Sequence, residues 1–425
     1  MVRKREMTSM LSVDLSTFDH GTQISQEPLA IDSASLYQAF EQVKDRRKKK
    51  GVRYPLAFVL TLIMLGKMAG ETTIEGIIDW VDLRKEKLKR LLNWPKKFPT
   101  YDVYTRVLTH CDHQEVAKAI TQVILNARSV EQCGDEPSRS LTQQVHGEEN
   151  LIHTAVDGKV LRGTLKHGRE DQPPVHLLTF YECESGLVLD QFSVEKKENE
   201  YSRCLAILHP LLVKGRILTA DAGIAYKEWC MIVHIMGGYY MIPIKDNHPA
   251  VRQDLILFFA DKGIDQSEFH SYKETNKGHG RLETREIWTS TQMNGFFAKD
   301  WAGIAQVYMI KRTVKEKGEE RIEIVYGMTN LPRKKADAER LLQLNRKHWT
   351  IENRLHHRRD VTLGEDASQV RTKGAPQVLA ALNGGILALM DFLGVKNVAK
   401  QMRRFCEYTS EALQLLLGKL SRENG

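Results

Sequence analysis

Two aspartates stand at positions that buried strands seldom give to a carboxylate. Asp157 follows the apolar run LIHTAV, and Asp221 follows the apolar run RILTA. A carboxylate is costly to bury there unless it is paired, hydrogen-bonded or bound to a metal. If the two runs are neighbouring strands, the carboxylates meet at one edge of a sheet and provide oxygen ligands for two hard cations. Such a pair of ions stabilises both the attacking and the leaving oxygen of a phosphoryl displacement. The pattern therefore predicts a site for two Mg²⁺ ions, with Mn²⁺ as a substitute.

A third acidic ligand is expected on a later helix that packs against the same edge. Glu352 lies in the stretch RKHWTIENRLHH, and helical spacing places His348, Glu352 and Leu355 on one face. Glu365 and Asp366, in the stretch GEDAS, compete for the same role. We prefer Glu352 because it lies in the middle of a helix, whereas GEDAS is typical of a loop or a helix start.

Each of these residues also has an ordinary structural explanation. Asp157 precedes Gly158, a common arrangement in turns, Asp221 could cap the next helix, and a helical glutamate such as Glu352 faces solvent by default. The joint pattern favours metal binding. Trp349, beside the glutamate, is expected to pack in the core. Three histidines near the glutamate, His348, His356 and His357, suggest a zinc site. However, no fourth ligand has suitable spacing and an HExxH motif is absent.

The elements that must position these residues alternate between strands and helices. Three strand-like runs (LIHTAVDGKV, PVHLLTFYE and LVLDQFSVE) precede a helix (NEYSRCLAILHPLLV), a strand (RILTADAG), a helix (AYKEWCMIVHIMGG) and a strand (YYMIPIK). This β-β-β-α-β-α-β order, with right-handed crossovers, is typical of a ribonuclease H-like α/β sheet. In that topology the first strand lies in the middle, next to the fourth, so Asp157 and Asp221 would meet.

Around this core the chain divides into further segments. Helical periodicity follows a polar leader, and a β-rich patch with Gly- and Lys-rich turns precedes the helix of Glu352. We predict a flexible leader (1–33), an all-helical basic DNA-binding domain (34–128), a linker (129–150), a ribonuclease H-like core (151–262 and 331–395), a β-rich insertion (263–330) and a C-terminal helical tail (396–425).

The distribution of charge indicates a polyanionic partner. The chain has 62 Lys and Arg against 54 Asp and Glu, a net charge of +8, and residues 41–100 alone have fifteen basic and seven acidic side chains. A surplus confined to one segment indicates double-stranded DNA, with a solvated helical surface as the alternative. The residues expected to contact DNA are Arg46, Arg47, Lys48, Lys49, Lys50, Arg53, Lys159, Arg162, Lys245, Asn247, His279, Arg281, Arg346, His348 and Arg359.

Composition and missing motifs exclude several other classes of protein. With 42% hydrophobic and 27% charged residues the chain is that of a globular protein, and its longest apolar run, residues 55–66, is shorter than the roughly 18–20 residues of a membrane span. Six scattered cysteines without a CxxC pair argue against a disulfide scaffold or a cysteine zinc site. Without Walker A or GxGxxG motifs, no nucleotide cofactor is expected. No GxSxG motif is present either. We expect a cytoplasmic protein with no membrane partner.

Ordered blocks of the sequence resemble one family of mobile-element enzymes. The blocks are VDGK followed by LRG, KKENE, TADAG, IPIKDNH, GHGRLETR and HWTIENRLHHRRDVTLGEDASQVR, preceded by DRRKKKGVRYPLAFVLTLIMLGKMAG and IEGIIDWV. They are similar to the signature blocks of ISAs-type insertion-sequence transposases, which are DDE enzymes related to the H-repeat-associated proteins. The resemblance extends from about Phe40 to Leu393.

The resemblance implies a bacterial, nucleoid-associated DNA transposase with a ribonuclease H-like core and a β insertion. Such an enzyme binds the terminal repeats of its element, cleaves DNA with Mg²⁺ and joins the 3′ ends to target DNA, and a homodimer would bring two ends together. Carried over by motif, the catalytic and metal-binding triad is Asp157, Asp221 and Glu352. Where the family's Y-(2)-R-(3)-E-(6)-K pattern has Tyr, Arg and Lys, this sequence has Asn345, His348 and Arg359.

Two rival functions stay open at this point. One is a nuclease of the same fold that cuts DNA without joining strands, which an assay for 3′-end joining would distinguish. The other is a domesticated, catalytically inactive DNA-binding protein, which would bind DNA but would not nick it with any divalent ion.

Overall fold

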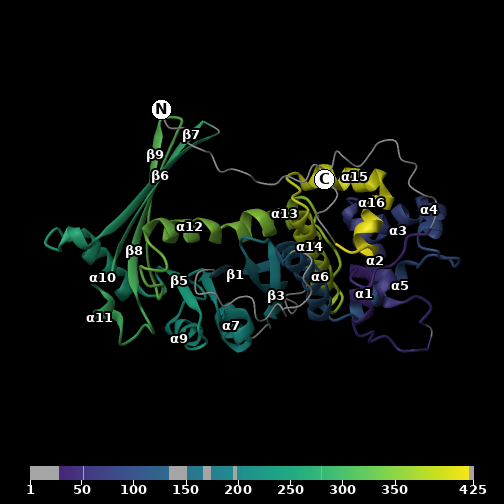
Figure 1. Ribbon diagram of the computed structural model, residues 1–425, viewed down its shortest axis with the longest axis horizontal. Helices are drawn as coiled ribbons and strands as arrows, with labels where there is room; N and C mark the ends of the chain where they lie inside the picture. The colour runs from purple at the N-terminus through teal and green to yellow at the C-terminus, as the bar shows by residue number, and fades with distance from the viewer. Residues whose placement is uncertain are drawn as a thin grey trace.

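The chain begins with a group of helices. The computed structural model describes residues 28–50, 52–133, 151–165, 174–194, 199–278 and 280–420 (Figure 1). Its first elements are α1 (Leu36–Glu41), α2 (Leu56–Met68), α3 (Ile74–Leu83), α4 (Lys85–Leu91), α5 (Tyr101–His110) and α6 (His113–Cys133). The last of these helices continues into the segment expected to be a linker. The leader up to residue 27 and residues 134–150 of that linker lie outside the described residues.

Local sequence explains how these helices begin and what they bury. The Thr73 hydroxyl accepts a hydrogen bond from the Gly76 amide at 2.9 Å and so caps α3, whose residues Ile74, Ile77 and Val81 form a buried face. Helix α2 is apolar on all sides, and each of its residues is buried. A helix with this composition has to lie inside the protein, surrounded by other helices.

The strands form one mixed sheet that joins the two β-rich parts of the sequence. The strands are β1 (Ile152–Leu161), β2 (Val175–Glu182), β3 (Leu187–Val194), β4 (Arg216–Ala220), β5 (Tyr239–Ile244), β6 (His270–Gly278), β7 (Arg281–Ser290), β8 (Gln306–Glu316) and β9 (Glu319–Thr329). Their order is β3-β2-β1-β4-β5-β9-β8-β7-β6. Strand β1 is parallel to β4 and β4 to β5, whereas the other neighbours are antiparallel. The predicted adjacency of the first and fourth strands is therefore confirmed.

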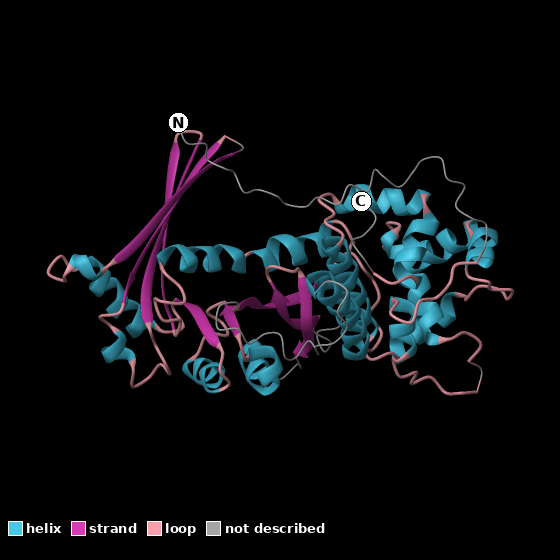
Figure 2. Cartoon of the chain, viewed as in Figure 1, coloured by secondary structure: helices cyan, strands magenta, loops and turns pink. Residues whose placement is uncertain are grey.

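The four strands of the β-rich patch extend this sheet instead of forming a separate one. Strand β9 pairs with β5, and β6 to β9 continue as two long hairpins. Their far ends project beyond the helices (Figure 2), and much of β6 and the first half of β9 are exposed. We call these four strands the β-arm.

Helices cover both faces of the sheet. One face packs against α7 (Glu200–Ile207), α8 (Pro210–Val213), α9 (Lys227–Ile235), α10 (Pro249–Ala260) and α11 (Asn294–Phe297). The opposite face packs against α12 (Ala338–His348) and α14 (Ala375–Phe392). Helix α12 crosses the middle of the sheet lengthwise in Figure 1 and leads into α13 (His357–Val361). It is therefore placed to bring residues of its far end to the edge where β1 and β4 end.

The last helices complete the core of the first ones. Helix α14 is long and apolar enough to cross a membrane, but 89% of it is buried inside the protein, where it packs against α6 and β3. Helices α15 (Val398–Glu407) and α16 (Thr409–Leu417) contact α1 and α2, and one hydrophobic cluster contains residues from both ends of the chain. The N-terminal helices and the C-terminal helices therefore stabilise one another.

Gly327 on β9 is expected to be essential for the junction between the sheet and the β-arm. A methyl group at this position would overlap the Ile242 carbonyl oxygen and the ring of Tyr308, whose hydroxyl donates to that oxygen at 2.8 Å. We expect Gly327→Ala to lower the free energy of unfolding by about 3 kcal/mol, as overpacking of a tight site does. Gly278→Ala, on β6 with open space around it, is the matched control. Urea unfolding of both variants measures the difference, and equal effects would contradict it.

Candidate functional site

The two aspartates lie where the parallel pairing of β1 and β4 ends, although β1 itself continues beyond Asp157 to Leu161. The parallel register pairs Val156 of β1 with Ala220 of β4, and Asp157 and Asp221 are the next residues of the two strands. Asp157 continues in the antiparallel ladder opposite Thr179, whereas Asp221 starts the loop after β4. Both carboxylates line one groove with a volume of about 590 Å³.

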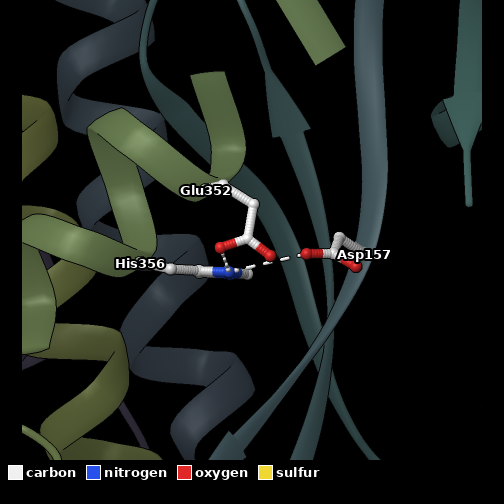
Figure 3. Close-up of side chains that lie close together, drawn as sticks. All are labelled: Asp157, Glu352 and His356. Carbon is white, nitrogen blue, oxygen red and sulfur yellow. Dashed lines mark ion pairs between the residues drawn. The ribbon is translucent and has the colours of Figure 1, made fainter. Parts of the chain in front are cut away.

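A third carboxylate and an imidazole join Asp157. Ligand atoms of Asp157, Glu352 and His356 all lie within 4.8 Å of one another. The Nδ1 atom of His356 is 3.5 Å from Asp157 Oδ2 and 3.9 Å from Glu352 Oε2, and the three side chains converge in Figure 3. Glu352 also lines the groove, so the three acids predicted from sequence are brought to one cavity.

An irregular turn of helix presents Glu352 and His356. Residues Ile351–His356 form a π-helical turn between α12 and α13. Such wide turns are rare in proteins and occur often at functional sites. The turn buries Ile351 and Leu355 on its inner side. Glu352 keeps about half of its side chain exposed to the groove, while the side chain of His356 is 5% exposed.

The electrostatics of the cluster favour a bound cation. Burial first, and then repulsion from Glu352, Glu200 and Asp221, raise the pKa of Asp157 to about 7. Its Oδ2 atom is buried and accepts no hydrogen bond from the described residues. Burial, together with Arg359 and Lys159, lowers the pKa of His356 to about 2, so its imidazole is neutral and offers a lone pair. Two carboxylates and a neutral imidazole fit a divalent cation.

Asp221 has a different partner from Asp157. Its Oδ1 atom lies 3.0 Å from the Lys245 ammonium. Burial would raise the pKa of Asp221, but the hydrogen bond from Lys245 and the Ala222 amide lower it below its usual value. Asn247 donates to the Ala222 carbonyl oxygen at 2.8 Å and accepts from the Lys245 amide at 3.2 Å. Asn247 therefore holds the loop after β5, which carries Lys245, against the loop after β4, which carries Asp221.

His348 is fixed by a buried chain of hydrogen bonds. Its Nδ1 atom lies 2.9 Å from the Thr219 hydroxyl, which is 2.8 Å from Nε2 of His153. Burial is the main reason that the pKa of His348 is lowered to about 4. His348 lines the groove beside Trp349, which is 56% exposed. The expectation that Trp349 packs in the core is wrong, because α12 turns this side chain toward the groove.

The competing acidic residues lie with other partners. Glu365 is buried, pairs with Arg359 at 2.7 Å and accepts a hydrogen bond from Asn383 at 2.8 Å. Asp366 lies 3.9 Å from Lys159. The structure thus places Glu352, and neither member of the GEDAS pair, beside Asp157.

The residues expected to contact DNA fall into an exposed set and a set with internal partners. Lys48, Lys49, Lys50 and Arg53 are exposed, and no ion pair joins them to the described residues. Arg46 is half-exposed and lies within 2.9 Å of Asp112 and Glu115. Arg162 is exposed, Arg281 and Arg346 line the groove, and His279 lies outside the described residues.

Three of the expected DNA contacts are buried. Arg47 pairs with Asp45 at 2.7 Å, Lys159 pairs with Asp360 at 2.6 Å, and Arg359 is fully buried against Glu365. Their charged groups face these carboxylates and not the surface. We therefore assign them to the interior of the fold and omit them from the proposed DNA surface.

His356 is the residue of the cluster that the sequence did not indicate. The sequence suggests zinc binding for His356 and offers no fourth ligand for it, and its position relative to Asp157 is not visible in the sequence. A usable signal was present, since His356 follows Glu352 by four residues and side chains at that spacing share a helical face.

Acidic side chains from two neighbouring strands and a later helix line one groove on a mixed sheet. Residues 149–389 match the family model described as "Transposase DDE domain", and residues 37–124 match the model described as "DDE_Tnp_1-associated". The first match covers more than half of the chain, and the chain therefore belongs to the DDE transposase family. The family expected from sequence is confirmed.

Named relatives agree with this assignment. The chain is 24% identical over 376 residues to "Putative transposase YncI" of Escherichia coli O157:H7, covering 87% of this chain and 91% of the relative. It is 23% identical over 346 residues to "H repeat-associated putative transposase YhhI" of Escherichia coli K12, covering 80% and 86%. A solved structure titled as the piggyBac transposase synaptic complex with hairpin DNA aligns with a TM-score of 0.40 and 9% identity, covering 89% of this chain and 80% of that one. That likeness is too distant to carry an argument.

Proposed function

We propose that this protein is a DNA transposase that cleaves phosphodiester bonds at the ends of its element and joins the freed 3′ ends to target DNA. The observation that carries the proposal is that Asp157, Asp221 and Glu352 line one groove in a chain of the DDE transposase family. We take strands β1 to β5 as a ribonuclease H-like core, since in their order 3-2-1-4-5 the first strand lies in the middle next to the fourth, the feature that the sequence analysis expects of that fold.

The proposed cofactor is Mg²⁺, with Mn²⁺ as a substitute. Asp157, Glu352 and His356 would hold one ion, and Asp221 would complete a second position once Lys245 turns toward a phosphate. Bound there, the ions supply a nucleophile at neutral pH and stabilise the charge that develops on the phosphoryl oxygens. Asp157 lies on a central strand and Glu352 on a helix packed across the sheet, so their carboxylates are positioned in advance of substrate binding.

The remaining side chains of the groove bind and orient DNA in this proposal. Lys245 lies next to Asp221 and provides an ammonium for the phosphate at the reacting position. Lys48, Lys49, Lys50 and Arg53 form a separate exposed basic surface that would contact DNA outside the groove. Bringing two element ends together requires two active sites, and we propose a homodimer for that step.

One assay distinguishes the three functions that the sequence left open. The purified full chain is incubated with a labelled duplex containing the DNA that flanks its gene, a target plasmid and Mg²⁺. A transposase cuts at the element end and transfers the labelled 3′ end to the plasmid. Cleavage with no joined product would identify a nuclease, and DNA binding with no nicking in Mg²⁺ or Mn²⁺ would identify an inactive DNA-binding protein. Either result would contradict the proposal.

A further inference from the structure

A buried glutamate on the β-arm gathers three arginines. Glu283 of β7 is 7% exposed, although the strands around it are largely solvated. Its carboxylate lies 2.7 Å from Arg285 and 3.4 Å from Arg281, and it also accepts a hydrogen bond from Arg312 of β8. The Glu283 carboxylate therefore contacts all three arginines, of which Arg312 also lies 3.3 Å from Glu323.

Two of these arginines are adjacent in the sheet and are flanked by carboxylates. Arg285 stands directly opposite Arg312 in the ladder of β7 and β8, and like charges at such positions repel. Glu274 of β6, 3.9 Å from Arg285, and Glu323 of β9, 3.3 Å from Arg312, stand at the two ends of the same row. Burial, Arg346 and Arg312 lower the pKa of Arg285 against the opposing effect of Glu283 and Glu274, whereas Glu283 and Glu323 raise the pKa of Arg312. The row therefore holds two adjacent guanidinium groups between two carboxylates.

The face of the β-arm that carries this row opens toward the acidic cluster. Arg281, Arg285 and Arg312 line the same groove as Asp157 and Glu352, whereas Glu283 does not line it. The guanidinium groups therefore lie between the glutamate and the open space. Arg346 of α12, held 2.6 Å from Glu274, lines the groove as well. The groove has the carboxylates of Asp157, Asp221 and Glu352 at one side and, along the β-arm, three arginines with Glu323 among them.

We propose that Arg285 and Arg312 form a clamp for two backbone phosphates of a duplex whose scissile phosphate lies at the acidic cluster, and that Glu283 holds the clamp open for the anions. The inference rests on the proposed function and names two binding residues that the sequence did not indicate. Guanidinium groups bind phosphate through paired hydrogen bonds, and a shared carboxylate fixes their direction before the ligand arrives. Because the contacts involve the backbone, the clamp reads no base sequence.

The test measures DNA binding without cleavage. Fluorescence anisotropy follows a short duplex of arbitrary sequence binding to the full chain in EDTA over a range of KCl concentrations. For the double variant Arg285→Gln, Arg312→Gln we expect the slope of log K against log [salt] to become shallower by about 1.8, since each neutralised phosphate contributes about 0.9. The affinity at low salt should fall roughly a hundredfold, about tenfold for each charged hydrogen-bonded contact.

A matched control removes the same charge from the other face. Lys311 and Lys315 lie on β8 with their side chains on the face away from the groove. The variant Lys311→Gln, Lys315→Gln should change the slope of log K against log [salt] by no more than about a third of the change seen for the arginine variant. The triple variant Glu283→Gln, Arg285→Gln, Arg312→Gln removes the buried charge together with its partners. It keeps the test valid if the double variant does not fold.

The outcomes separate this proposal from the proposed function. Equal changes for the two faces, or an unchanged slope for the arginine variants, would overturn the clamp even in a chain that cleaves DNA. A larger decrease in the salt slope for the arginine variant than for the lysine variant supports the clamp even in a chain that does not cleave DNA.

Discussion

Asp157→Asn is expected to lower the rate of Mg²⁺-dependent cleavage at an element end by about a thousandfold or more. The change keeps the size of the side chain but removes the negative charge from the centre of the cluster with Glu352 and His356. Charge stabilisation by a bound metal contributes several kcal/mol to such a reaction, and each 1.36 kcal/mol corresponds to a tenfold change in rate. Glu352→Gln should cause a loss of the same order.

The control for this prediction is Asp79→Asn, which removes an exposed carboxylate of α3 far from the groove residues. Its cleavage rate should stay within about twofold of the wild type. Binding of the same duplex in EDTA should be no weaker for Asp157→Asn, because removing a negative charge does not repel DNA. If Asp157→Asn cleaved DNA at the rate of the wild type, Asp157 would have no part in the mechanism.

Asp157→Asn is also expected to raise the free energy of unfolding of the metal-free protein relative to the wild type, and to do so increasingly as the pH rises from acidic values toward 7. The folded state holds the pKa of Asp157 at about 7, above its ordinary value near 3.8, so the folded state binds this proton more tightly than the unfolded chain does. Protonated Asp157 therefore contributes its full stabilisation of the folded wild type below pH 4, and this stabilisation is lost as the pH rises toward 7. The complete loss is about 4 kcal/mol, the free-energy equivalent of that change in pKa. Asparagine has no such dependence.

Urea unfolding in EDTA at pH 5 and pH 8 measures this effect. We expect the stability difference between Asp157→Asn and the wild type to grow in favour of the variant by about 2.5 kcal/mol between pH 5 and pH 8, because part of the complete loss has already occurred at pH 5. Asp79→Asn should change by less than about 0.5 kcal/mol, as exposed substitutions do. A difference independent of pH would show that Asp157 is not buried among like charges. Added Mg²⁺ should restore the advantage of the wild type.

The adjacency of Asp157 and Asp221 could be predicted from sequence because it follows from general rules. Three strand-like runs followed by two crossover units leave few arrangements of a sheet, and handedness selects among them. Asp221 follows the end of β4 as expected, whereas β1 continues past Asp157 to Leu161, and the two carboxylates meet where the pairing of these strands ends. Glu352 was found for a similar reason, since a helix after the β-rich patch had to pack on the sheet.

The remaining parts of the site depend on contacts between distant segments. His356 reaches Asp157 through a π-helical turn, which no periodic pattern indicates. Lys159 and Arg359 were expected at the DNA surface because the sequence does not show that Asp360 and Glu365 pair with them inside the protein. A basic residue in a sequence is a candidate phosphate ligand only until its internal partners are known.

The two ends of the chain show the same limit at the level of the fold. The N-terminal helices and a C-terminal helical segment were recognised by their periodicity, but their common core was not. Nor does the sequence show that the β-rich patch extends the central sheet through the pairing of β9 with β5. That pairing brings the face of Arg285 and Arg312 to the groove, and so it determines which residues of the β-arm are proposed to meet DNA.

Diffraction from crystals of the wild-type protein soaked in Mn²⁺, recorded at the manganese absorption edge, tests the shared metal centre most directly. We expect an anomalous peak bonded to carboxylate oxygens of Asp157 and Glu352, with Asp221 released from Lys245 to face a second ion, and no such peak in Asp157→Asn. Manganese bound only elsewhere on the molecule, or an undiminished peak in the variant, would contradict the assignment of these acidic side chains to catalysis.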